Sequence, residues 1–156
     1  MRREFLILSL SLAACHNTHK PVVNSARHLA LVSRPGNAIY VDRADNRMVM
    51  QTDSAVQKNF CSFLIGLTDS SAGKNNQGST ERERYIQYEL QKDWKALANG
   101  DTLQAVFFQE KPGLDQQVKE GVMVFETPGG IQPDTLIYRD SYGNWGTQIL
   151  SLKENK

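Results

Sequence analysis

The sequence predicts a mainly β fold (class α+β): a small antiparallel β-sandwich or barrel with one inserted amphipathic helix. Two observations support this prediction. About seven or eight short runs have the composition of strands, and turn signals with glycine, proline or asparagine separate them. One stretch, between residues 80 and 100, instead has the apolar spacing of a helix. A single curved sheet with the helix packed on it is the alternative.

The first strands are predicted as a three-stranded meander over residues 28–33, 38–42 and 47–52. Arg34-Pro35-Gly36-Asn37 separates the first two strands. It has proline in the second position and glycine in the third, as a type II turn requires. Residues 43–46 form the second predicted turn.

Residues 55–67 fit two structures. Val56, Phe60, Phe63, Leu64 and Leu67 fit a helical stripe, whereas residues 60–67 alone fit a buried strand, which we favour. Cys61 lies in this run between apolar flanks, which favours a buried small hydrophobe over a nucleophile or an intermolecular disulfide. The polar residues 68–79 indicate a loop or a long connection.

The helix is predicted to begin at Thr80, which forms a capping box with Glu83, and to stop at Gly100. Its apolar stripe has spacings of four, four and three residues and comprises Ile86, Leu90, Trp94 and Leu97. Four strands follow, over residues 102–109, 121–126, 134–139 and 145–152, and turn residues separate them.

The N-terminal sequence predicts where in the cell the protein is located. Two arginines precede an eight-residue apolar stretch, residues 5–12, which is too short to span a bilayer and long enough for a signal peptide. Leu12-Ala13-Ala14-Cys15 then resembles the lipobox of bacterial lipoproteins. That resemblance implies cleavage before Cys15 and acylation of Cys15, which becomes the lipid anchor in the bilayer. In that family, an aspartate directly after the cysteine favours retention in the inner membrane. His16 occupies this position here. The resemblance therefore implies that the protein lies at the periplasmic face of the outer membrane, or at the cell membrane in a Gram-positive organism.

We therefore expect a cleaved signal peptide over residues 1–14, a lipidated N-terminus and tether over 15–26, and a single globular domain over 27–156. Cleavage removes two of the 18 basic and one of the 17 acidic residues, so 16 of each remain and the net charge is zero. A neutral chain without a basic patch argues against nucleic acid as a partner.

No motif predicts an enzyme, a cofactor or a metal. His16, His19 and His28 all lie at the tether end of the chain. Catalysis needs side chains held in a fixed arrangement, which a tether is not expected to provide. No ligand spacing of a known metal site is present. An acid–base pair among Glu110, Glu120, Glu126, Asp134 and Asp140 is the weaker alternative.

The richest aromatic segment runs from Tyr138 to Gly146 and predicts either a hairpin or a binding surface. Gly143-Asn144 suits a hairpin turn, across which Tyr138 would pair with Trp145 or a neighbour. If the segment binds a partner, the expected exposed anchors are Arg139 and Tyr142, because these residue types dominate recognition surfaces.

These observations predict a non-enzymatic, outer-membrane-anchored periplasmic lipoprotein that binds another protein. Small lipoproteins of this size resemble accessory subunits of envelope machines, such as secretion-channel pilotins or secretion-system lipoproteins. An immunity lipoprotein that inhibits a periplasmic toxin is one alternative, and an envelope hydrolase that uses carboxylates is another. No motif chooses between the accessory subunit and the immunity lipoprotein.

Overall fold

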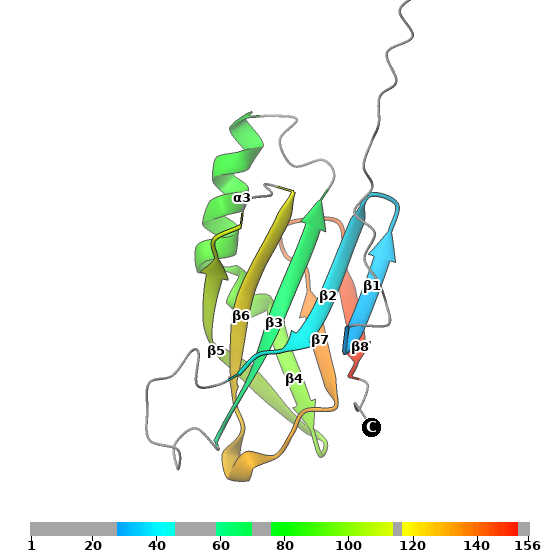
Figure 1. The fold of residues 1–156 in the computed structure, drawn as a ribbon, viewed down its shortest axis with the longest axis vertical. Helices are drawn as coiled ribbons and strands as arrows, with labels where there is room; N and C mark the ends of the chain where they lie inside the picture. The colour runs from blue at the N-terminus through cyan, green and yellow to red at the C-terminus, as the bar shows by residue number, and fades with distance from the viewer. Residues whose placement is uncertain (1–27, 46–58, 70–75, 114–116, 153–156) are drawn as a thin grey trace, which may run out of the picture.

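The computed structural model describes residues 28–45, 59–69, 76–113 and 117–152. Within these ranges the protein is an antiparallel, nearly closed barrel of eight strands with one short α-helix (Figure 1). The sheet order is β1-β2-β3-β6-β5-β4-β7-β8, and every neighbouring pair is antiparallel. β1 and β8 end this order and contact each other across the seam. The predicted mainly β class is confirmed, in its barrel form.

The strands range from five to eleven residues in length. The strands are β1 (Ala30–Arg34), β2 (Asn37–Arg43), β3 (Phe60–Asp69), β4 (Trp94–Ala98), β5 (Asp101–Lys111), β6 (Val118–Glu126), β7 (Thr135–Arg139) and β8 (Thr147–Ser151). The helices are α3 (Asn76–Tyr88) and two 3-10 turns, η1 (Leu90–Asp93) and η2 (Pro128–Gly130). α3 contacts β5 near one end of the barrel (Figure 1).

Most predicted strands are present within a few residues of their expected bounds. The favoured strand over residues 60–67 is confirmed as β3, and its inner residues are buried. The predicted turn between β1 and β2 is also confirmed, because Gly36 has the positive φ of 82° that the third position of a type II turn requires. The predicted strand over residues 47–52 lies outside the described residues.

The helix prediction is wrong over its second half. α3 begins at Asn76, before the expected cap at Thr80, and ends at Tyr88. Trp94 and Leu97 lie on β4, which pairs with β5 on one side and β7 on the other. β4 alternates buried and more exposed residues, the period of a strand, and a tight turn at Asn99 (φ 51°) and Gly100 (φ 89°) leads directly into β5.

The interior of the barrel is filled by large apolar side chains from β2, β3, β4, β6 and β7. Trp94 is fully buried, and its ring stacks on Tyr138 with centroids 4.8 Å apart. α3 and η1 add three buried residues to this core: Tyr85, Ile86 and Leu90. Other fully buried members are Ile39, Val41, Phe63, Phe125, Met123 and Leu136.

Cys61 is a buried residue of β3, as expected from its apolar flanks. The residue is 3% exposed, and its Sγ lies 3.6 Å from the side-chain oxygen of Gln132. Burial raises the pKa of this thiol, which disfavours the reactive thiolate.

The outer face of β2 and β3 carries a buried tyrosine. The Tyr40 ring lies over Gly66, where a Cβ atom would come within 1.9 Å of the ring, so glycine is required at this close approach. The Tyr40 hydroxyl donates a hydrogen bond to Glu120 on β6. Burial, followed by this carboxylate, raises the pKa of Tyr40.

Across the described ranges, no helix has both the length and the apolar content that crossing a membrane requires.

Candidate functional site

A cleft of about 180 Å³ opens at the end of the barrel where β1 finishes. Segments far apart in the sequence form its walls: the β1–β2 turn, the end of β3, α3 and the loop between β7 and β8. We call residues 140–146 the β7–β8 loop. The lining residues are Arg34, Asn37, Leu67, Thr68, Arg82, Tyr85, Ile86, Tyr138, Asp140, Tyr142, Gly143, Asn144 and Trp145.

The Asp140 carboxylate holds the β7–β8 loop in shape. Its Oδ1 accepts hydrogen bonds from the backbone N–H groups of Tyr142 at 3.2 Å and Gly143 at 2.8 Å. Its Oδ2 accepts from the backbone N–H of Trp145 at 2.8 Å. The Tyr138 hydroxyl donates to Oδ1 at 3.1 Å. One carboxylate thus satisfies three loop amides, which fixes the loop much as an Asx turn does.

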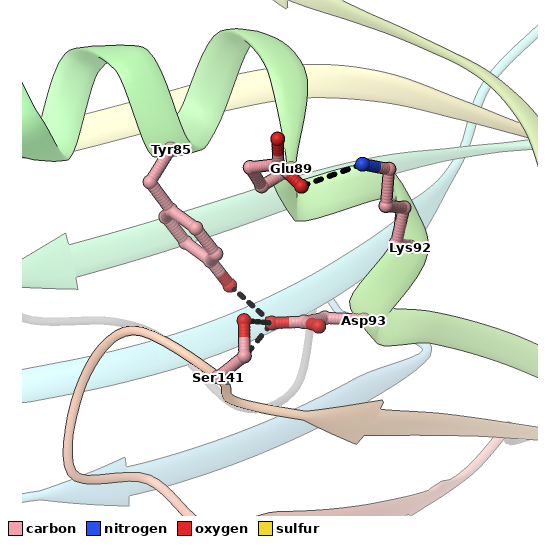
Figure 2. Close-up of polar contacts among 5 residues, drawn as sticks. All are labelled: Tyr85, Glu89, Lys92, Asp93 and Ser141. Atoms are coloured by element: carbon pink, nitrogen blue, oxygen red, sulfur yellow. Dashed lines mark hydrogen bonds and ion pairs between the residues drawn. The ribbon is translucent and has the colours of Figure 1, made fainter.

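A second carboxylate ties the same loop to α3 (Figure 2). Asp93 Oδ2 accepts hydrogen bonds from the backbone N–H and the hydroxyl of Ser141, at 2.8 and 2.7 Å. The Tyr85 hydroxyl donates to the same oxygen at 2.7 Å. Asp93 therefore connects the helix, the η1 turn and the start of the loop.

Two buried phenols complete this network beneath the cleft. The hydroxyl oxygens of Tyr85 and Tyr138 lie 3.1 Å apart. Burial raises the pKa of both phenols, and the neighbouring carboxylates, Asp93 for Tyr85 and Asp140 for Tyr138, raise it further. Both phenols therefore remain neutral at physiological pH and act as hydrogen-bond donors to the carboxylates.

Arg34 joins the β7–β8 loop to the opposite edge of the sheet. Its Nη1 donates to the backbone oxygen of Asn144 at 3.0 Å, and its Nη2 donates to that of Trp145 at 3.1 Å. The guanidinium carbon also lies 4.8 Å from the centre of the Trp145 ring, within cation–π range. Arg34 thus spans the seam between β1 and β8 at the cleft.

Tyr142, one of the two predicted anchors, stands at the rim of the cleft. Its ring stacks on Tyr85 with centroids 4.9 Å apart and planes 17° from parallel, yet the residue is 43% exposed. Arg139, the other predicted anchor, is exposed at the end of β7, opposite Thr147 of β8, and is not among the lining residues. The cleft therefore contains Tyr142 and excludes Arg139.

The hairpin reading of this segment is confirmed, with a longer loop than expected. β7 and β8 pair, but Tyr138 lies opposite Gln148 rather than Trp145. Trp145 stays in the loop, half-buried against Arg34. The site residues that sequence reasoning missed are Arg34, Trp145 and Tyr85.

The carboxylates considered for acid–base chemistry are already engaged or lie apart from the cleft. Glu110 pairs with Lys119 at 3.1 Å, and Glu120 lies 3.7 Å from Lys111 and accepts from Tyr40. Of the five carboxylates, the cleft contains Asp140, whose two oxygens bind the loop and Tyr138.

The histidines and metal-binding side chains show no cluster in the part of the chain that the structure describes. There, no group of three or more His, Cys, Asp or Glu side chains could hold a metal ion. His28 contacts Asp42 at 2.8 Å, and its ring lies 4.7 Å from that of Tyr40. His16 and His19 lie outside the described residues.

Comparisons of the chain with protein-family models, with curated proteins and with solved structures gave no significant match. Function is therefore inferred from the residues of the cleft and from the sequence of the N-terminus.

Proposed function

We propose that the protein is a non-enzymatic lipoprotein of the periplasmic face of the outer membrane, anchored through Cys15, that binds another protein at the cleft. The observation that supports binding is Tyr142, an exposed aromatic ring on a loop fixed by two carboxylates. Trp145 and Arg34 lie beside it, and tyrosine, tryptophan and arginine are the residues that most often carry binding energy at interfaces.

Rigidity strengthens this proposal. Binding costs free energy when side chains and loops must become ordered, and a preorganised surface avoids much of that cost. The β7–β8 loop already has its backbone amides satisfied by Asp140 and its start bonded to Asp93. The Tyr142 ring is already stacked on Tyr85. A partner therefore meets a surface that needs little further ordering.

The anchor is tested by Cys15→Ser. This change is expected to abolish labelling with radioactive palmitate and to release the protein from the membrane fraction, because the acyl chains attach at Cys15 and hold the protein through their buried methylenes. Cys61→Ala is the matched control, since Cys61 is buried in β3 and its loss should leave the label in place. A wild-type protein that fractionates with membranes but incorporates no label would contradict the anchor.

The binding surface is tested by capturing partners from solubilised envelopes with the full-length protein. Tyr142→Ala is expected to weaken capture by at least about 2 kcal/mol, or roughly thirtyfold, the scale of an interface hot spot. Its stability should change by no more than about 1 kcal/mol, because the residue is 43% exposed. The identity of the captured protein then separates an envelope assembly from an incoming toxin.

Two single variants sharpen this experiment. Tyr88→Ala removes a tyrosine that is 67% exposed and does not line the cleft, so capture should be unchanged. Arg139→Ala reports whether the surface extends to the outer face of β7. Equal capture by wild type and Tyr142→Ala would move the binding surface away from the cleft.

A further inference from the structure

The charge of Arg34 is not balanced by an acid within the described residues. None of their carboxylates forms an ion pair with this guanidinium, whose contacts are two backbone oxygens and the Trp145 ring. A guanidinium has five N–H donors. Two of them donate to the backbone oxygens of Asn144 and Trp145. Three N–H donors of Arg34 therefore remain, on an exposed side chain at the cleft.

The contacts of Arg34 favour an anion beside it in the cleft. The charged lining of the cleft comprises two arginines, Arg34 and Arg82, and one aspartate, Asp140. The Asp140 oxygens accept four hydrogen bonds from the loop and from Tyr138, which stabilise its negative charge in place. Arg34 therefore presents its remaining N–H donors at the cleft, and arginine is the side chain best suited to bind carboxylates through paired hydrogen bonds.

The size of the cleft limits what can enter. Pockets for drug-sized molecules occupy about 300–1,000 Å³. This cleft is smaller, at about 180 Å³, and its walls include the aromatic residues Tyr142 and Trp145. One side chain with an apolar stem and a charged end matches this combination of volume, aromatic wall and arginine.

We propose that the cleft receives an acidic side chain, glutamate or aspartate, from the partner protein, and that Arg34 binds its carboxylate. The proposal depends on the protein-binding function above and names the chemistry of the partner. In this arrangement the aromatic rim contacts the stem of the inserted residue. The same guanidinium holds the β7–β8 loop and the incoming carboxylate, so it positions the loop and provides specificity.

The test uses the full chain, isotope-labelled and purified in detergent, and two isosteric probes, acetyl-glutamate-amide and acetyl-glutamine-amide. NMR follows the indole N–H signals of the two tryptophans. The glutamate probe is expected to shift the Trp145 signal in a saturable way. The glutamine probe should bind at least about tenfold more weakly, because it lacks the charge that Arg34 recognises. The fully buried Trp94 supplies an internal reference that should not move.

Variants assign the effect to one residue. Arg34→Gln is expected to weaken the glutamate probe at least about tenfold, and Arg139→Gln, which removes an arginine outside the cleft, should leave it unchanged. Equal affinity for the two probes, or full affinity in Arg34→Gln, would overturn the proposal. If Arg34→Gln shifts the Trp94 signal and so perturbs the fold, the comparison of the two probes on the wild type still decides.

The two proposals fail separately. If the protein captures a partner through Tyr142 but binds both probes equally, the protein-binding function is supported and the carboxylate site is contradicted. If the protein prefers the glutamate probe but captures no partner, the carboxylate site is supported and the protein-binding function is contradicted.

Discussion

Replacing Trp94 by alanine is expected to lower the free energy of unfolding by about 3–5 kcal/mol, the range for removing a large aromatic side chain from a core. Trp94 is 0% exposed and stacks on Tyr138, so its loss leaves a cavity between β4 and β7. Chemical denaturation of the full chain in detergent, followed by circular dichroism, measures the change.

The matched control for Trp94 is Tyr88→Ala. Tyr88 is a large aromatic residue at the end of α3, but it is 67% exposed. Its removal should change stability by less than about 1 kcal/mol. A loss for Trp94→Ala that is as small as the loss for Tyr88→Ala would mean that β4 does not contribute its tryptophan to the core.

Stability is expected to fall steeply above about pH 10, the ordinary pKa of tyrosine. The pKa values of Tyr40, Tyr85 and Tyr138 are all raised by burial. Below this pH the phenols are protonated in both states, so they add no pH dependence. Above it the unfolded chain releases protons that the folded chain keeps, at a cost of about 1.4 kcal/mol per pH unit for each phenol. Three phenols together cost about 4 kcal/mol per pH unit.

Denaturation curves at a series of alkaline pH values measure this effect, and tyrosinate absorbance shows whether the buried phenols ionise only when the chain unfolds. Tyr85→Phe removes one of the three ionisations, so its stability should fall less steeply with pH than that of the wild type. Smooth ionisation of all tyrosines in the folded protein would contradict the burial of these hydroxyls.

The sequence predicted the strands well and the end of the helix badly, for one physical reason. Ile86 and Leu90 belong to the buried side of α3 and η1, so the apolar spacing up to residue 90 reflects real helical geometry. Trp94 continues that spacing by coincidence. Its segment pairs with β5 across a tight turn and with the distant β7, and this strand pairing overrides a local pattern that fits both periods.

A local signal for the correct structure was present. Asn99-Gly100 is the dipeptide most typical of a two-residue hairpin turn. Both residues have positive φ, as a type I′ turn requires, and they join β4 to β5. Gly100 also fits the stop of a helix, and that interpretation leaves out both the turn and β4.

The candidate site was predictable only in part. Tyr142 and the aromatic content of the β7–β8 loop are visible in the sequence, because turn residues and aromatic residues are adjacent there. Arg34 belongs to a turn more than 100 residues away and reaches the loop because β1 and β8 meet at the seam. Neither its contact with Trp145 nor the separation of Arg139 from the cleft follows from local sequence.

The direction of β1 separates the N-terminal entry of the barrel from the cleft. β1 runs from Ala30 to Arg34, so the place where the tether joins the barrel is roughly 13 Å from the cleft, at the strand's other end. There the Leu29 N–H donates to Val41, which fixes the entry of the chain. The segment that precedes residue 28 therefore joins the barrel at the end of β1 opposite the cleft, so the entry of the chain does not itself occupy the proposed binding surface.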